Sequence, residues 1–422
     1  MSRSVVVVGG GLAGLVAARH LADGGADVTV YEQRETVGGR VRSREHRGFR
    51  LDRGFQVLLT GYPAVQRELD LAALELRYFN PGAVLARPGQ RSVLSDPLRD
   101  PLATFETITN SEVSFSDKLR TLALRRDLAG RPFETLFSRS DSSIREYLRE
   151  WGFSERYLSN FIAPFYGGIT LDRSLGTSKR VFEYTFKALS EGRTAVPSEG
   201  MGAITRQLAE RAEQAGAEIV TGEAVTELKR KRRHATVITD DDRRAVDAVV
   251  VATQPTVAAR LTGNEDIPTD AVGCVTQYYR LDGPPLDTGN RLLLNAGDTT
   301  PNTIVPLSEV APEYAAGDEQ LLNATFLGKD VFETSSEQLA ARTHKTLEAW
   351  YPERSFESLS RLETDRIQFA QFAQPPGTHD SLPDVRDGGR RTYLAGEYTE
   401  WSSIQGAIKS GRTAAEAVLA DF

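Results

Sequence analysis

The residues of this chain that could do chemistry begin near its N-terminus, where glycines and one acid follow a run of valines. The run Val5–Val8 leads into Gly9, Gly11 and Gly14, spaced Gly-x-Gly-x-x-Gly, and Glu32 stands 18 residues past Gly14. A glycine loop of this kind lets backbone N–H groups at a helix N-terminus approach a pyrophosphate. An acid about 20 residues further on accepts hydrogen bonds from a ribose. We therefore expect a dinucleotide site.

The surrounding segments have the patterns of the elements that must position this site. Val5–Val8 predicts a buried parallel strand, and the alanine- and leucine-rich stretch up to Gly24 predicts a helix. A second strand is expected at Val28–Tyr31, ending at Glu32. The first glycine makes the tight turn from strand to helix, and Gly14 allows close packing of the helix on the sheet.

Gly38, Gly39 and Arg40 narrow the choice of dinucleotide. The two glycines let the chain turn back towards the phosphates, and Arg40 supplies a fixed positive charge for them. An NAD-dependent dehydrogenase, the alternative at this point, does not need this second clamp. With the N-terminal motif, the segment resembles the superfamily of flavin amine oxidases, protoporphyrinogen oxidases and phytoene desaturases. The resemblance implies non-covalently bound FAD as the cofactor.

The C-terminal segment resembles the same superfamily. Residues 392–395 predict a short strand that is followed by Gly396 and Glu397, and a helix is expected to begin near Ser403. The resemblance implies that Glu397 bonds through the ribityl–phosphate region. It also implies that the N–H groups of the last helix face the flavin ring, where negative charge grows on reduction. The run Leu394–Thr399 is most similar to the desaturase branch.

Two further segments complete the expected cofactor site. Residues 48–59 resemble the family loop that crosses beside the flavin, although Asp52 within it could equally be a simple turn acid. Met201 and Val225 match the family's helix start and its adenine-contacting strand. The residues expected to bind FAD are Gly9, Gly11, Leu12, Ala13, Gly14, Glu32, Gln33, Gly39, Arg40, Gly54, Phe55, Gln56, Val225, Gly396, Glu397, Ile404 and Ala407.

The cofactor segments are separated along the chain, which predicts a discontinuous domain. The expected fold class is α/β, with a doubly wound, Rossmann-like FAD-binding domain and an inserted α+β substrate domain. The expected boundaries are 1–60, 196–261 and 390–422 for the FAD-binding domain, and 61–195 and 262–389 for the substrate domain. Residues 63–190 are mostly helical in pattern. Strands are expected at 274–281, 291–295 and 320–327, and a helix at 336–350.

Composition excludes several functions. The net charge is −7. The basic cluster Lys229–His234 predicts a solvated hairpin tip, and its electrostatic field is largely cancelled by Asp240–Asp242. No nucleic-acid partner is therefore expected. The single cysteine, Cys274, excludes an internal disulfide, and the five scattered histidines have no metal-ligand spacing. No signal peptide or membrane-spanning run is recognisable. We expect a cytoplasmic protein with a contact at the membrane surface.

The substrate is indicated by aromatic side chains that gather between residues 133 and 186. A flavin pocket for a bulky apolar molecule would be lined in this way, but an ordinary aromatic core of a helical subdomain has the same composition. Gly167 and Gly168 indicate that the backbone passes close to another group. The resemblance implies hydride transfer from an apolar, isoprenoid or carotenoid-like substrate to the flavin N5, with oxygen or a quinone as the unidentified electron acceptor.

No catalytic acid or base is assigned. Aligned by its paired tyrosines, the segment 273–280 places Cys274 where amine oxidases of this superfamily often carry a lysine, which argues against amine oxidation. A small buried core residue is the alternative role for Cys274. A porphyrinogen and then an amine are the alternative substrates. A flavin-binding protein without turnover is the alternative of another class.

Overall fold

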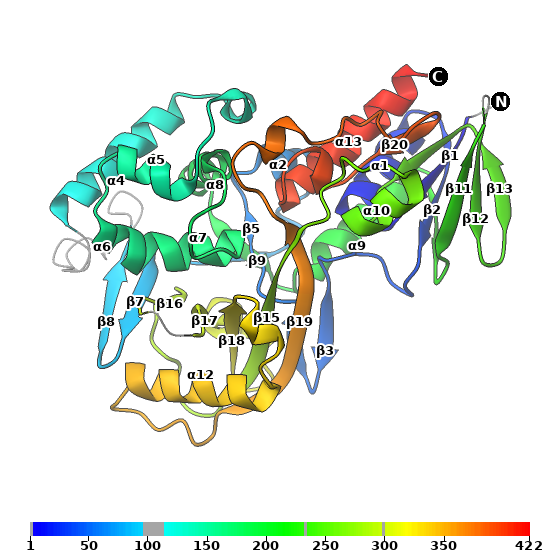
Figure 1. The fold of residues 1–422 in the computed structure, drawn as a ribbon. Helices are drawn as coiled ribbons and strands as arrows, with labels where there is room; N and C mark the ends of the chain where they lie inside the picture. The colour runs from blue at the N-terminus through cyan, green and yellow to red at the C-terminus, as the bar shows by residue number, and fades with distance from the viewer. Residues whose placement is uncertain (1–2, 96–113, 232–233, 298–299) are drawn as a thin grey trace.

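The computed structural model describes residues 3–95, 114–231, 234–297 and 300–422. Figure 1 shows three regions: a parallel sheet with its helices, which carries both termini, a lobe of helices, and a large, mainly antiparallel sheet beneath that lobe. Among the described residues, no helix is long and apolar enough to cross a bilayer. The domain boundaries expected from the sequence stay a prediction.

Five parallel strands form the sheet of the first region, in the order β10-β2-β1-β14-β20. They are β1 (Ser4–Val8), β2 (Asp27–Glu32), β10 (Glu218–Thr221), β14 (Ala248–Val251) and β20 (Thr392–Leu394). The valines of β1 pair with β2 on one side and with β14 on the other. A central parallel strand is buried on both faces, which explains its uninterrupted apolar sequence.

The two faces of this sheet are covered differently. Val5 and Val7 point to the face that packs on α1 (Leu12–Asp23), α9 (Gly202–Gln214) and α13 (Ile404–Ala420). Val6 and Val8 point to the opposite face, which is covered by α10 (Pro255–Thr262) and a small antiparallel sheet. That sheet comprises β11 (Val225–Arg230), β12 (Ala235–Thr239) and β13 (Arg243–Val246). The expected hairpin joins β11 to β12, and residues 232–233 of its tip lie outside the described residues.

The large sheet has seven strands in the order β19-β15-β18-β17-β16-β7-β8. They are β7 (Ala83–Arg87), β8 (Gln90–Leu94), β15 (Ala271–Leu281), β16 (Leu293–Asn295), β17 (Thr303–Pro306), β18 (Gln320–Leu327) and β19 (Ser360–Phe372). Helix α12 (Ser336–Trp350) packs on one face, and the helical lobe lies over the other (Figure 1). The expected strands at 274–281, 291–295 and 320–327 and the helix at 336–350 are confirmed.

The helical lobe comprises α4 (Phe115–Ala129), η1 (Phe133–Ser138), α5 (Ile144–Glu150), α6 (Glu155–Tyr157), η2 (Leu158–Ile162), α7 (Ala163–Thr170) and α8 (Lys179–Glu191). Smaller elements join the regions: β3 (Ser43–His46), β4 (Phe49–Asp52), β5 (Leu58–Leu59), α2 (Pro63–Glu68), β6 (Leu76–Tyr78), β9 (Thr194–Pro197) and α11 (Leu307–Val310). Serine caps begin α4, α5 and α6.

The helical pattern expected for residues 63–190 is wrong for residues 76–94, although α2 before them is helical. That stretch contains β6, β7 and β8. Tertiary pairing decides these strands, because β7 pairs with β16 and β6 with β9, more than 100 residues away in each case. Strand β19 is also absent from the expectations. Its sequence carries four charged residues in 13, and most of its residues are partly exposed at the sheet edge, so it lacks an apolar alternation.

Close packing of α1 on the sheet depends on Gly14, which gives a testable prediction. A Cβ at Gly14 would overlap the carbonyl oxygen of Gly9, whereas one at Gly11 would meet no atom within 4 Å. We expect Gly14→Ala to destabilise the protein by roughly 3 kcal/mol, because the helix and the turn must move apart.

The matched control is Gly11→Ala, which should melt near the wild-type temperature but bind FAD more weakly, because its methyl group enters the open space. Thermal denaturation and FAD titration of both variants test this pair. Equal melting temperatures for the two variants would contradict it.

Candidate functional site

A single cavity of about 950 Å³ begins at the carboxyl ends of the parallel strands and continues between the helical lobe and the large sheet. Every residue expected to bind FAD lines this cavity except Gly14, which packs beneath it against Gly9. A site at this end of a parallel sheet is typical of doubly wound folds, because the loops after the strands and the helix N-termini open there.

The N-terminus of α1 has the features of an anion site. Gly11 is the N-cap residue and provides no side-chain cap, so the first N–H groups of the helix, including those of Leu12 and Ala13, have no partner within the helix. A Cβ at Gly11 would stand in open space that belongs to the cavity. These N–H groups and the positive end of the helix dipole suit a pyrophosphate.

Glu32 stands at the end of β2 with its carboxylate held in place by backbone. The N–H of Gly10 donates to one carboxylate oxygen at 2.9 Å, and the N–H of Arg34 donates to the other at 3.0 Å. The residue is 4% exposed. Each carboxylate oxygen has two lone pairs, so further hydrogen bonds from ribose hydroxyls can be accepted without moving the side chain.

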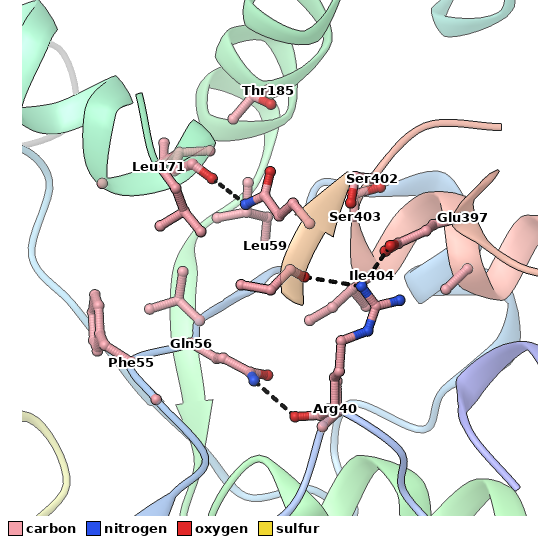
Figure 2. A pocket seen from close by; sticks show the side chains of 18 of the residues that line it. Arg40, Phe55, Gln56, Leu59, Leu171, Thr185, Glu397, Ser402, Ser403 and Ile404 are labelled. Carbon is pink, nitrogen blue, oxygen red and sulfur yellow. Dashed lines mark hydrogen bonds and ion pairs between the residues drawn. The ribbon is translucent and has the colours of Figure 1, made fainter. Parts of the chain in front are cut away.

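Arg40 joins the first and last cofactor segments. Its guanidinium donates to a carboxylate oxygen of Glu397 at 2.5 Å and to the backbone oxygen of Ala370 on β19 at 2.9 Å. Figure 2 shows the side chain reaching across the cavity towards Glu397, with Gln56 donating to the Arg40 carbonyl oxygen behind it. The ion pair is mostly shielded from water, since Glu397 is 5% exposed.

Further arginines surround Arg40 and raise the positive potential of this end of the cavity. Arg34 and Arg53 line it, and Arg42 lies beside them. Burial lowers the pKa of Arg53 and of Arg42, and repulsion from neighbouring arginines lowers both further. Arginine stays charged in spite of this, so the cluster gains stability from a bound polyanion such as a pyrophosphate.

The start of α13 and the loop after β4 face each other across the cavity. Ser403 caps α13 by accepting from the Gly406 N–H at 2.8 Å, and Ile404 and Ala407 line the cavity one turn apart. Gly54 has a φ of +77°, and its carbonyl oxygen, with that of Asp52, accepts from the Tyr278 hydroxyl. The large sheet therefore holds the loop that carries Phe55 and Gln56 in place.

Beyond this loop the cavity wall becomes apolar. The helices of the lobe contribute Tyr157, Phe161, Ile162, Phe165, Tyr166, Ile169, Leu171, Val181, Phe186 and Leu189. Figure 2 shows Leu59 and Leu171 on this side, away from Arg40 and Glu397. Both explanations of the aromatic cluster thus apply to parts of it. Tyr157, Phe161 and Phe165 line the cavity, whereas Trp151 and Phe153 pack in the core behind them.

The floor of the cavity offers no proton acceptor. Cys274, Thr276 and Ile367 lie beside Gly54, and burial raises the pKa of the Cys274 thiol to about 12, which keeps it neutral. Among the described residues that line the cavity, the only carboxylates are Glu32 and Glu397, and none is a histidine. This arrangement suits a reaction in which a hydride leaves carbon without a dedicated base.

Sequence reasoning missed several lining residues. Thr253 and Gln254 follow β14, and their position after a parallel strand could have indicated them. Gln371 donates to the backbone oxygen of Ile169 at 2.6 Å and so ties β19 to α7. No sequence signal indicates Gln371, because β19 itself was not recognised.

Comparison with known proteins agrees with this geometry. The family model described as flavin containing amine oxidoreductase matches residues 12–419. The chain belongs to this family. The cavity fits FAD, since an open cradle at Gly11, a fixed acid at Glu32 and an arginine cluster meet there. The protein is thus a flavin-dependent oxidoreductase with FAD as its cofactor.

The individual proteins that this flavoprotein resembles are named for different substrates. It is 24% identical to zeta-carotene desaturase of Synechocystis sp. over 99% of this chain and 97% of that one. It is 32% identical to phytoene dehydrogenase of Streptomyces griseus over 61% of this chain and 56% of that one. A structure from Exiguobacterium sp., provisionally named protoporphyrinogen oxidase, covers 100% of both chains with a TM-score of 0.74 at 17% identity. The last likeness shows the shared fold.

The Arg40–Glu397 pair gives a prediction for cofactor binding. We expect Arg40→Gln to raise the dissociation constant of FAD by roughly tenfold to a hundredfold, because a charge-assisted donor contributes about 1.5–3 kcal/mol. Glu397 would also lose its partner while buried. Isothermal titration of the apoprotein with FAD measures the change. The control, Arg206→Gln, removes an exposed arginine of α9 and should leave FAD binding unchanged.

Asp52 is a buried acid rather than a turn acid at the surface. It is 3% exposed and accepts from the Ser43 hydroxyl at 2.5 Å, the Met201 N–H at 2.9 Å and the Tyr314 hydroxyl at 3.2 Å. Burial raises its pKa to about 6 in spite of these hydrogen bonds. The carboxylate therefore links β4 to the start of α9 beneath the loop that carries Gly54.

This raised pKa predicts how stability depends on pH. Protonation of Asp52 favours the folded state, so its contribution is fully present below about pH 4 and is lost as the pH rises through 6. Asp52→Asn removes this dependence while keeping an acceptor for Met201. Its stability relative to wild type should therefore rise by up to about 3 kcal/mol between pH 4 and pH 7. Thermal midpoints across this range test it, and parallel curves for the two proteins would contradict it.

Proposed function

We propose that this flavoenzyme dehydrogenates an apolar, isoprenoid or carotenoid-like substrate that reaches it from a membrane surface. The observation that carries the proposal is the single cavity of about 950 Å³, whose cofactor end is polar and whose remaining wall is mainly aliphatic and aromatic. Such a wall binds a hydrocarbon by removing its surface from water. The desaturase relatives support the same substrate class.

We further propose that the lining residues expected from the sequence hold FAD. Leu12 and Ala13 offer their N–H groups to the pyrophosphate, Glu32 binds a ribose, and Arg40 with Glu397 fixes the middle of the cofactor. The bound flavin supplies the hydride acceptor. The protein excludes water from the reacting carbon with the side chains of α7 and α8 and provides no base of its own. The electron acceptor, oxygen or a quinone, is not specified by these residues.

A porphyrinogen is the second candidate substrate, on a separate observation. Three further basic residues line the cavity, Lys118, Arg125 and Arg193. They come from other segments of the chain than the arginines of the cofactor end. Positive side chains of this kind could bind the carboxylates of a porphyrinogen, which a hydrocarbon does not need. An amine is disfavoured, because the cavity floor beside Gly54 holds Cys274 and Thr276 rather than a basic group.

The test is an anaerobic titration of the FAD-loaded protein with candidate donors. We expect phytoene or zeta-carotene in detergent micelles to bleach the flavin absorbance and to gain conjugated double bonds, which chromatography of the extracted pigment detects. Protoporphyrinogen and putrescine should leave the flavin oxidised. Bleaching by either of these, and by neither carotenoid, would overturn the proposal.

A variant pair ties that reaction to the apolar wall. Ile169 lines the cavity, so Ile169→Asn should slow bleaching by the carotenoid about tenfold or more, because an unpaired amide then faces the hydrocarbon. Ile169→Val keeps the wall apolar and should react at nearly the wild-type rate. The flavin spectrum before titration confirms that both variants retain the cofactor.

A further inference from the structure

Among the residues that the structure describes, three large apolar side chains are exposed to solvent, and all three belong to α4. Phe115 is 72% exposed, Leu119 is 53% exposed and Leu122 is 50% exposed. Their spacing of four and three residues places them on one face of the helix. We call these three residues the α4 stripe. Soluble surfaces rarely gather large apolar side chains in one place without a partner.

The α4 stripe is continuous with the cavity. All three of its residues line the cavity, together with Lys118 and Arg125 of the same helix. Helix α4 runs along the outer side of the helical lobe, away from the parallel sheet (Figure 1). The stripe is therefore exposed at the molecular surface and also forms part of the rim of the cavity. It lies at the end of the cavity opposite the cofactor residues.

The inner face of α4 is packed and both of its ends are anchored, so the stripe is exposed on a helix that is fixed in place. Leu124 and Leu128 on its inner face are 1% and 0% exposed. At its N-terminal end the fully buried Asp117 accepts from the Ser154 N–H at 2.9 Å and from its hydroxyl at 2.7 Å. At its C-terminal end Lys187 donates to the Leu128 carbonyl oxygen at 3.2 Å.

The net charge of α4 indicates which kind of partner the α4 stripe binds. The helix carries Lys118, Arg120, Arg125 and Arg126 against Asp117 and Asp127, a net charge of +2, whereas the whole chain has a net charge of −7. A basic helix with one apolar face lies in the plane of an anionic membrane surface, with its apolar side chains in the headgroup–acyl boundary. A protein partner would not require this combination beside a cavity with an apolar wall.

We propose that α4 docks on an anionic lipid bilayer through Phe115, Leu119 and Leu122, with its basic side chains at the headgroups. The cavity then opens into the lipid, so an apolar substrate enters without crossing water. The role given to this docking, delivery of an apolar substrate, rests on the proposed function. The docking itself is a property of the surface and can be measured without turnover.

The experiment is co-sedimentation of the FAD-loaded full chain with vesicles. Vesicles of phosphatidylcholine with phosphatidylglycerol should bind the protein, vesicles of phosphatidylcholine alone should bind it much less, and added salt should weaken binding. The double variant Leu119→Ser/Leu122→Ser should bind at least about tenfold more weakly, since burial of each apolar side chain drives insertion. Its flavin spectrum and melting temperature should be those of wild type, because both side chains are exposed.

A matched pair of charge reversals tests the electrostatic part. Arg126 is exposed on α4 and Lys345 is exposed on α12, which lies on the far side of the large sheet. Arg126→Glu should weaken binding to the anionic vesicles by about fivefold or more, in line with about 1 kcal/mol for each basic side chain near the surface. Lys345→Glu should leave binding unchanged.

Several outcomes would overturn the docking proposal. The first is that the protein does not bind vesicles, and the second is that the two charge reversals have equal effects. The third is that the protein binds no vesicles but forms a dimer in sedimentation analysis, and that the double variant of the α4 stripe is a monomer. The last result would assign the stripe to a second copy of the chain. Failure of the proposed function is a separate result, because the detergent titration with carotenoids needs no bilayer.

Discussion

The ion pair between Arg40 and Glu397 is the constraint on which the site depends. The two residues are 357 positions apart, and both are needed at the same end of the parallel sheet. Burying Glu397 without its partner would cost several kcal/mol, so the pair favours only arrangements in which the first and last segments of the chain converge. The hydrogen bond from Arg40 to Ala370 adds β19 to this junction. One guanidinium thereby contacts both the C-terminal cofactor segment and the large sheet.

Around this junction the cavity changes character over a short distance. The cofactor end is formed by backbone N–H groups, one fixed acid and several arginines whose mutual repulsion a polyanion relieves. The far end is mainly aliphatic and aromatic, and Cys274, on the cavity floor beside Gly54, is held neutral by burial. The chain therefore supplies binding, orientation and dryness, while the redox chemistry belongs to the flavin. This division explains how relatives of one family can act on carotenoids and still share the fold of oxidases.

The exposed face of α4 continues the apolar wall of the cavity onto the outside of the molecule. An apolar substrate is scarce in water and concentrated in lipid, so a cavity for it works best with its opening at a bilayer. The contacts of Asp117 and Lys187 hold both ends of α4, which leaves the position of its apolar face fixed rather than adaptable. Under the two proposals, substrate entry and cofactor binding lie at opposite ends of a single cavity.

The sequence by itself determined the elements whose signals are local. The valine run, the glycine spacing and Glu32 indicated the cofactor fold, and all but one of the expected FAD residues line the cavity, because steric demands near a phosphate leave few alternatives to glycine. Only the tertiary structure decided the strands β6, β7 and β19, whose partners are distant in sequence, and β8, which completes a hairpin with β7. It likewise decided which aromatic residues face the cavity and which form the core. It revealed that Asp52 is buried and that the α4 stripe is not, because burial depends on what packs against a residue rather than on the residue itself.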